Sequence, residues 1–301
     1  MPETTEKVIS VAFTVDEKYI PYATTALVSL FMNNGNELFN VYIIYNTISE
    51  SSKSKIISSC KNFDHQIIFI KIDDSFLANA PITHHISLAA YYRLSLVNLL
   101  PVELDKILYF DADIFIRKSI RKLWDANISD YALAATIAAG MDDYPKELLL
   151  KESSLYFNSG IMLINLNYWR KIDVYNTGIA LIKDQPERIK WWDQDILNII
   201  FENKWLPVSL EWNAQPYIFD EIGSAPESIK SKYKKYNYLQ AKTHPAIVHY
   251  AGGTKPWTGG SNLPFAAEYF NYFNKTSWKP GLLNKTVIFF KKCFSKITHA
   301  K

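Results

Sequence analysis

The amino-acid sequence predicts an α/β fold with a mainly parallel central sheet, and three observations support this. Through the first half of the chain, short apolar runs alternate with stretches of helical periodicity. The runs have the length of strands, and the stretches between them are long enough for helices that cross back over a sheet. The composition, 48% hydrophobic and 21% charged, is typical of a globular protein. Strands joined by such crossovers lie side by side in parallel, which predicts a single layered domain.

Each element follows from a local pattern. The run 8–15 is apolar and short, as expected of a buried strand, and 22–32 has the apolar spacing of a helix. The expected strands span residues 8–15, 40–45, 66–72, 106–110, 132–138, 161–165 and 247–250. The expected helices span residues 22–32, 50–61, 87–99 and 193–202. The polar, lysine-rich stretch 223–243 has no pattern that assigns it to a helix or to a strand.

Acidic residues follow two of the expected strands. Asp16 comes directly after 8–15, and Asp111 comes directly after 106–110. In open parallel sheets, ligands bind beyond the carboxyl ends of the strands. The sequence therefore predicts a Rossmann-like nucleotide-binding domain, without a glycine-rich phosphate loop, and we expect this catalytic domain to span residues 1–265.

The positive charge of the chain is concentrated near its C-terminal end. The formal net charge is +3, and no acidic residue follows Glu268. The lysines beyond it are Lys275, Lys279, Lys285, Lys291, Lys292, Lys296 and Lys301. A nucleic-acid-binding protein would carry basic surface on its body, so we expect no nucleic-acid partner and a local anionic one instead.

A basic amphipathic helix is expected in this last segment. From Leu283 onwards, bulky apolar residues recur at a spacing of three or four, at Val287, Phe290, Phe294 and Ile297. A helix with one apolar face and lysines off that face is suited to an anionic membrane surface. We therefore interpret 266–301 as a membrane-association segment, the alternative being a C-terminal helix docked on the protein's own core.

Signals for export are missing from the sequence. Residues 1–10 lack a basic stretch followed by an apolar run, and no apolar stretch is long enough to span a bilayer. Cys60 and Cys293 lie far apart and form no disulfide or metal-binding pattern. These features predict a cytoplasmic protein, held peripherally on the inner face of the cell membrane.

The strongest local motif is Asp111-Ala112-Asp113, at the end of an apolar run. Residues two apart on extended chain project to the same side, so both carboxylates can converge on one point. Two like charges there favour a bound cation, and hard oxygen ligands suit Mg²⁺ or Mn²⁺. The alternative is that both acids only shape a turn or cap a helix.

A second candidate site lies around His249. A histidine at a strand end can offer a neutral nitrogen to a metal. Gly252 would let the backbone approach a ligand, and Lys255 would place a positive charge near phosphate. The alternative is a surface loop that carries a structural histidine.

Polar side chains also open the expected helix 193–202. Asp193, Gln194 and Asp195 offer carboxylate and amide groups to sugar hydroxyls, although acids at a helix N-terminus also serve as caps. Asn158, in the motif Phe157-Asn158-Ser159-Gly160, either forms a hydrogen bond to a further hydroxyl of the ligand or only shapes a turn.

In this order, the motifs resemble those of glycosyltransferase family 8, in particular its bacterial lipopolysaccharide and lipooligosaccharide α-galactosyl- and α-glucosyltransferases. The resemblance runs from about residue 8 to residue 257. It rests on Phe13-x-x-Asp16-x-x-Tyr19, His85-Ile86-Ser87 with Arg93, Tyr109-Phe110-Asp111-Ala112-Asp113, Phe157-Asn158-Ser159-Gly160, Asp193-Gln194-Asp195-Ile196-Leu197-Asn198, and His249-Tyr250 through Lys255-Pro256-Trp257. The resemblance implies a GT-A fold, a UDP-hexose donor (UDP-galactose or UDP-glucose) and a saccharide acceptor, such as a lipid-linked glycan.

The resemblance also implies roles for the matched positions. Mn²⁺, or Mg²⁺ in its place, would be held by Asp111, Asp113 and His249. The uracil would contact Asp16, with Thr14 and Val15 shaping its pocket, and the diphosphate would contact Gly252 and Lys255. His85 would lie towards the acceptor. The expected catalytic set is Arg93, Asn158, Asp193, Gln194 and Asp195. The matched motifs add Tyr19, Ala112 and Ser159 to the donor site.

Two positions depart from the family's pattern. Lys18 stands where the family often has an asparagine at the ribose, and Ala138 stands where the galactosyltransferases have an acidic residue that serves the sugars. The specificity for galactose and for its acceptor is therefore not carried over to this chain.

Retention of configuration requires either an enzyme nucleophile with two inversions or attack from the same face. Gln194 matches the presumed nucleophile position, and a neutral amide is a poor nucleophile. Asp193 and Asp195 are the alternatives, and we expect same-face attack. Three alternative functions remain: that of a sugar-nucleotide hydrolase, of a nucleotidyltransferase or of a non-catalytic UDP-sugar-binding protein.

Overall fold

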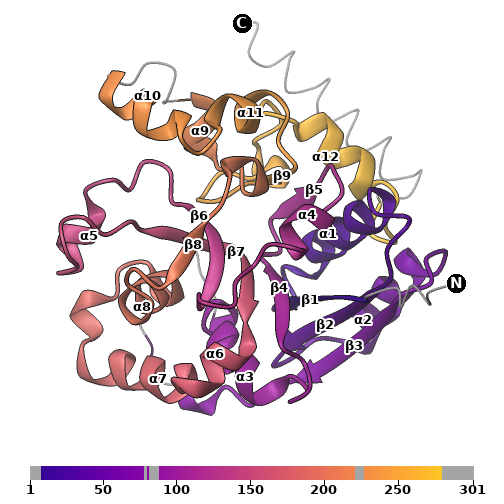
Figure 1. Cartoon of the computed structure of the whole chain (residues 1–301). Helices are drawn as coiled ribbons and strands as arrows, with labels where there is room; N and C mark the ends of the chain where they lie inside the picture. The colour runs from indigo at the N-terminus through magenta and orange to yellow at the C-terminus, as the bar shows by residue number, and fades with distance from the viewer. Residues whose placement is uncertain (1–7, 78–79, 81–87, 221–226, 280–301) are drawn as a thin grey trace, which may run out of the picture.

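A seven-stranded sheet forms the centre of the computed structural model, which describes residues 8–77, 80, 88–220 and 227–279 (Figure 1). Its strands are β1 (Ile9–Thr14), β2 (Phe39–Tyr45), β3 (Gln66–Lys71), β4 (Lys106–Phe110), β6 (Leu133–Ile137), β7 (Phe157–Asn165) and β8 (Trp205–Pro207). They lie in the order β3-β2-β1-β4-β7-β6-β8. Strand β7 runs antiparallel to β4 and β6, and the other pairs are parallel. The predicted α/β fold with a mainly parallel sheet is confirmed.

Helices account for most of the remaining described chain. They are α1 (Ile20–Met32), α2 (Glu50–Cys60), α3 (Leu96–Leu99), α4 (Arg121–Trp124), α5 (Tyr144–Glu147), α6 (Leu166–Lys171), α7 (Val174–Asp184), α8 (Trp192–Ile200), α9 (Pro216–Asp220), α10 (Glu227–Lys234), α11 (Tyr238–Thr243) and α12 (Ala266–Phe273). Short 3-10 helices are η1 (Ser75–Leu77), η2 (Leu88–Ser95), η3 (Pro186–Arg188), η4 (Leu210–Trp212) and η6 (Pro256–Thr258).

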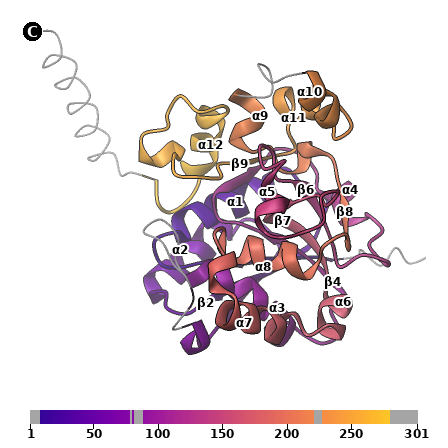
Figure 2. The same ribbon diagram turned by 90° about the vertical axis from the view of Figure 1, so that its left-hand side faces the viewer.

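Two of these regions differ from the expectation. The helix expected over 87–99 is mostly the 3-10 helix η2, continued by the single turn of α3. The stretch 223–243, for which no element was expected, contains α10 and α11, which lie with α9 at one end of the molecule (Figures 1 and 2). These helices are mostly polar, and few apolar residues, among them the buried Tyr233 and Ala241, mark the side that packs inwards. The sequence therefore shows no clear helical periodicity there.

The sheet has a hydrophobic core on each face, because side chains alternate along its strands. From β1, Val11 and Phe13 point into the core that α1, α2 and α4 cover. Ala12 and, from β4, Tyr109 point into the opposite core, covered by η2, α3, α6, α7 and α8. Helices on both faces leave the strand ends as the accessible part of the sheet.

The antiparallel direction of β7 determines which residues meet at the carboxyl end of β4. In the β4–β7 pairing, Phe110 is opposite Ile161, so the first residues of β7 lie beside the residues that follow β4. The Asp111 N–H accordingly donates to the Gly160 carbonyl at 2.7 Å. The 157–160 motif and the 111–113 motif are thereby brought to the same edge of the sheet.

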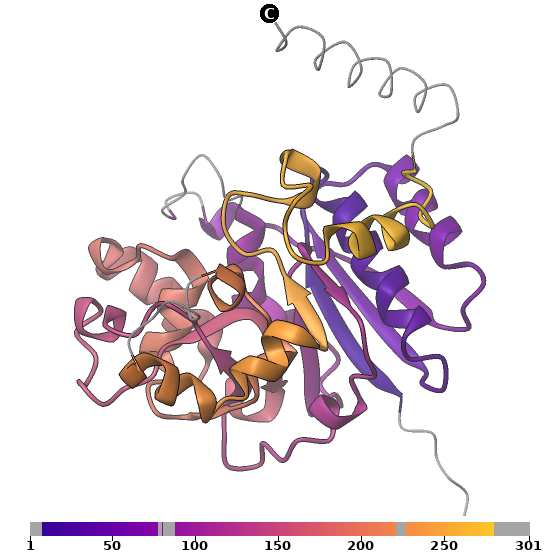
Figure 3. The ribbon, with the colours of Figure 1, turned by 90° about the horizontal axis from the view of Figure 1, so that it is seen from above.

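A small two-stranded sheet completes this edge. Strands β5 (Ile114–Ile116) and β9 (Ile247–His249) pair antiparallel, with Ile114 opposite His249. This register places His249 next to the 111–113 motif. Helix α12 packs alongside α1 (Figures 1 and 3), and its Tyr269 is buried against Phe115 and Tyr250.

The expected membrane-association segment is described only up to residue 279. The amphipathic pattern that begins at Leu283 lies outside the described residues. Within the described ranges, no helix is both long and apolar enough to cross a membrane.

Candidate active site

A cavity of about 640 Å³ opens at the carboxyl ends of β1 and β4. Its wall contains fifteen of the residues predicted from the sequence: Thr14, Val15, Asp16, Tyr19, Arg93, Asp111, Ala112, Asp113, Asn158, Ser159, Asp193, Gln194, His249, Gly252 and Lys255. Asp195 is not part of this wall, and His85 lies outside the described residues. The volume is in the range of natural small-molecule sites.

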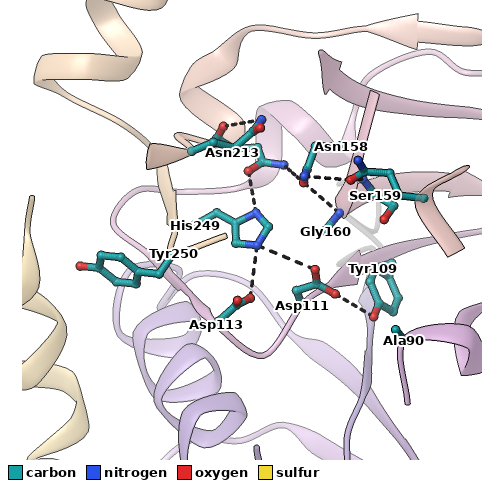
Figure 4. A network of polar contacts seen from close by, with 12 residues as sticks. Ala90, Tyr109, Asp111, Asp113, Asn158, Ser159, Gly160, Asn213, His249 and Tyr250 are labelled. Carbon is teal, nitrogen blue, oxygen red and sulfur yellow. Dashed lines mark hydrogen bonds and ion pairs between the residues drawn. The ribbon is translucent and has the colours of Figure 1, made fainter. Parts of the chain in front are cut away.

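Asp111, Asp113 and His249 converge on one side of the cavity (Figure 4). One ligand atom from each lies within 4.8 Å of the other two. The His249 Nε2 atom is 3.2 Å from Asp113 Oδ1 and 3.8 Å from Asp111 Oδ2. Two carboxylate oxygens and one imidazole nitrogen fit a divalent ion such as Mn²⁺, with further positions left for phosphate oxygens or water.

Gly160 makes this convergence possible. A Cβ atom on Gly160 would lie 2.4 Å from His249 Cε1 and 2.7 Å from Asp111 Oδ2. Both distances are far below van der Waals contact, so only glycine leaves room for the cluster at this point of β7. Gly160 belongs to the motif Phe157-Asn158-Ser159-Gly160, but the sequence does not indicate this role.

His249 is held from behind by Asn213. The Asn213 Oδ1 atom lies 3.0 Å from His249 Nδ1, the ring nitrogen that faces away from the two aspartates. Asn213 is completely buried, directly after η4. Nothing in the local sequence distinguishes this asparagine from a turn residue, and the sequence prediction missed it.

Lys255 brings a positive charge to the same group. Its Nζ forms an ion pair with Asp113 Oδ2 and also donates to the Tyr250 carbonyl. Burial alone would raise the pKa of Asp113, but the charge of Lys255 and the contact with His249 outweigh it and hold that pKa well below its usual range. The Asp113 carboxylate is therefore kept ionised, as a metal ligand must be.

Arg93 connects the Asp111–Asp113–His249 cluster, called the metal-type cluster below, to the start of α8. Its buried guanidinium is 2.8 Å from Asp111 Oδ1 and 3.1 Å from Asp193 Oδ2, and it donates to the Ser159 carbonyl at 2.7 Å. Burial raises the pKa of Asp193 to about 6; Arg93 opposes this shift, and the nearby Asp111 charge adds to it. The Ser159 hydroxyl donates a further hydrogen bond to Asp193 at 2.8 Å.

Gln194 has a fixed orientation in the cavity wall. The Ser159 N–H, which can only donate, contacts Gln194 Oε1 at 3.1 Å, and Asn158 Nδ2 donates to the same oxygen at 3.0 Å. The Gln194 amide nitrogen donates to the Tyr156 hydroxyl at 3.1 Å. The oxygen that would act as a nucleophile is thus already engaged by two donors.

Asp195 lies behind the cavity wall. Its Oδ1 accepts from the Tyr156 hydroxyl at 2.6 Å, and its Oδ2 accepts from the Tyr144 hydroxyl at 3.0 Å and from the main chain at Lys190 and Trp191. The side chain is fully buried. Asp195 therefore does not line the cavity with the other predicted catalytic residues, and it reaches Gln194 through the Tyr156 hydroxyl that both side chains contact. Its contacts are those of a residue that anchors α8.

The opposite end of the cavity begins at β1. Thr14 Oγ1 and the Tyr109 hydroxyl are 2.7 Å apart, and that hydroxyl donates to Asp111 Oδ1 at 3.0 Å. Asp16 Oδ1 accepts from the Tyr19 N–H at 3.0 Å, and Asp16 lines the cavity wall. Lys18 is exposed and does not line the cavity, whereas Ala138 does.

Comparisons with known proteins agree with this geometry. The family described as "Glycosyl transferase family 8" matches residues 10–260. General stress protein A of Bacillus subtilis is 32% identical over 277 residues, covering 91% of this chain and 96% of that protein. Lipopolysaccharide 1,2-glucosyltransferase of Escherichia coli K12 is 26% identical and covers 97% of this chain and 86% of that protein. A crystal structure of the galactosyltransferase LgtC with donor and acceptor sugar analogues has a TM-score of 0.82 at 25% identity, covering 90% of this chain and 98% of that chain.

Proposed function

Because the chain belongs to glycosyltransferase family 8 and is a glycosyltransferase, we propose that it transfers galactose or glucose from UDP to a saccharide, with retention of configuration. The observation that carries the proposal is the position of the Asp111–Asp113–His249 cluster. It lies in the same cavity as the amide and carboxylate groups that open α8. A leaving diphosphate and a transferred hexose would fit side by side there.

The nucleoside would bind at the end of β1. Asp16 has a carboxylate oxygen at the cavity wall, where it can accept the uracil N–H, and Thr14 and Val15 form the adjacent wall. Tyr19 lines the same end of the cavity and offers an aromatic face to the base. The donor is therefore proposed to be a UDP-sugar.

The diphosphate would lie against the residues of the metal-type cluster. Asp111, Asp113 and His249 would hold Mn²⁺ or Mg²⁺, which when bound supplies positive charge to the leaving diphosphate. Lys255 adds a fixed positive charge on the same side, and Gly252, with φ of 93°, lets the main chain approach the phosphates closely. Departure of UDP would then need no general acid.

The hexose would be surrounded by Arg93, Asp193 and Gln194. We propose that the acceptor attacks from the face that UDP leaves, because the Gln194 oxygen already accepts two hydrogen bonds and the Asp193 carboxylate is paired with Arg93. In this mechanism the departing phosphate takes the acceptor proton. Gln194 and Asn158 would orient the sugar hydroxyls rather than form a covalent bond.

The acceptor would enter along the apolar part of the wall. Trp191, which is 44% exposed, and Trp192 lie there, and Ala138 supplies no charge to the sugars. Relatives that carry the names of lipopolysaccharide glucosyl- and galactosyltransferases favour a lipid-linked glycan as the acceptor. The lysine-rich tail beyond residue 279 would hold the enzyme at an anionic cytoplasmic membrane surface.

Turnover of a panel of UDP-hexoses with Mn²⁺ tests the proposal. Sugar release is followed by NMR, first without an acceptor and then with lipopolysaccharide fragments and other glycans. Metal-dependent release of an α-anomer identifies the donor and establishes retention, and a rate increase with one glycan identifies the acceptor class. If no UDP-hexose is turned over with any of these glycans, the proposed reaction is wrong.

A further inference from the structure

Asn213 is fully buried behind His249, on the side away from the cavity. It is not one of the residues that line the cavity. The next residue, Ala214, is bonded to β9 through its N–H to the Ile247 carbonyl at 2.9 Å, and it accepts from the His249 N–H at 3.0 Å. The strand that carries the imidazole therefore also fixes the asparagine against it.

The direction of the hydrogen bonds around Asn213 follows from one backbone group. The Gly160 N–H can only donate, so the Asn158 atom that it contacts at 3.0 Å is the amide oxygen. The same oxygen contacts Asn213 at 2.8 Å, so the Asn213 atom in that contact is its amide nitrogen. The Asn213 oxygen is then left facing His249 Nδ1 at 3.0 Å, where it must accept (Figure 4).

A second backbone group supports the same assignment. The Ser159 N–H donates to Gln194 Oε1, and this oxygen also accepts from Asn158 Nδ2. The amide nitrogen of Asn158 therefore points to Gln194, and its amide oxygen points to Gly160 and Asn213. The Gly160 N–H and the Ser159 N–H lead to this same orientation independently.

We propose that Asn213 is a positioning residue that keeps the proton of His249 on Nδ1. Nε2 is then without a hydrogen and faces Asp111 and Asp113 with a free lone pair, the form in which an imidazole binds a metal. This inference rests on the proposed metal site and adds the residue that prepares its third ligand. It also gives a role to a buried amide that does not line the cavity.

Mn²⁺ affinity, measured by titrating Mn²⁺ alone and following the free ion by electron paramagnetic resonance, tests the inference without any turnover. Asn213→Leu removes the acceptor and should weaken Mn²⁺ binding about 10- to 100-fold. Asn213→Asp again places an oxygen against Nδ1 and should recover most of the affinity. Asn165→Leu is the control: this asparagine lies at the far end of β7, its amide donates to the Ile128 and Tyr131 carbonyls, and its loss should leave the affinity unchanged.

The outcomes separate this inference from the proposed metal site. If wild-type protein binds Mn²⁺ and Asn213→Leu binds it equally well, the positioning role is wrong and the metal site stands. The same conclusion follows if Asn213→Asp is as weak as Asn213→Leu. If His249→Gln and wild type bind Mn²⁺ equally, the metal site itself is wrong, and the inference fails with it.

The tautomer can also be observed directly. In ¹⁵N-histidine-labelled protein loaded with Mg²⁺, the His249 signals are assigned by their loss in His249→Gln. We expect Nδ1 to carry the hydrogen in wild type and in Asn213→Asp. A hydrogen on Nε2 in the wild-type protein would overturn the inference.

Discussion

Gly160 and His249 approach each other so closely that the site has no room for a side chain at residue 160. A methyl group on Gly160 would lie 2.4 Å from His249 Cε1. The contact depends on β7 running antiparallel to β4, because only then does the start of β7 lie beside the residues that follow β4. The cluster of two aspartates and a histidine thus depends on a residue with no functional group.

Gly160→Ala should therefore disable the site while the fold is retained. The added methyl group must displace His249 or Asp111, and a displacement of about 1 Å at such a centre costs about 100-fold in rate. We expect Mn²⁺-dependent kcat/KM to fall by at least this factor, measured as UDP release. Gly35→Ala is the control, since a Cβ there meets nothing within 4 Å. Equal activity of the two variants would show that the cluster tolerates the methyl group.

Removing Arg93 should destabilise the protein as well as inactivate it. Arg93→Met leaves the buried Asp193 carboxylate without its partner, and breaking such a pair costs about 3–5 kcal/mol in the free energy of unfolding. Urea denaturation of Arg93→Met and of Arg93→Met/Asp193→Asn measures this, and the double variant should recover part of the loss. Lys190→Met breaks the exposed pair with Glu147 and should cost about 1 kcal/mol or less. A loss in Arg93→Met no larger than in Lys190→Met would contradict the assignment.

The sequence predicts the parts of this site that carry their own local signal. Asp111 and Asp113 are recognisable because two acids follow an apolar strand, and His249 because it ends another. Asn213 and Gly160 have no such signal, since their roles come from contacts between segments far apart in the chain. The reversal of β7 was likewise not predictable, because an isolated apolar run has the same pattern in either direction. Asp195 shows the opposite case: its place in a motif suggests chemistry, and its four hydrogen-bond donors show an anchoring contact.

Gln194→Ala should retain far more activity than Asp113→Ala. If the acceptor attacks from the face that UDP leaves, Gln194 only orients the sugar, and its loss should cost about 10- to 100-fold in kcat. Asp113→Ala removes a carboxylate of the metal-type cluster and should cost about 1,000-fold or more. Single-turnover rates with one UDP-hexose compare the two variants. Equal, severe losses would favour a covalent role for Gln194, and trapping of a glycosylated enzyme by mass spectrometry would then be the decisive measurement.

The raised pKa of Asp193 predicts opposite effects of pH on activity and on stability. Burial, the main cause, raises this pKa to about 6, above the ordinary value of 3.8. The ionised form pairs with Arg93 in the sugar site, so kcat/KM should fall as the pH drops through about 6. The folded protein binds the proton more tightly than the unfolded chain does. The stability contributed by this group is therefore fully present below about pH 3.8 and is lost as the pH rises through about 6.

Asp193→Asn separates the Asp193 contribution from those of other titrating groups. The variant cannot ionise at residue 193. Its kcat/KM should therefore fall less at acid pH than that of wild type, and its free energy of unfolding should change less between pH 4 and 6. Ser159→Ala, which removes a donor to the carboxylate while leaving it able to ionise, should shift the acid limb to higher pH, because the ionised form loses a hydrogen bond. An acid limb that is the same in wild type and Asp193→Asn would assign it to another residue.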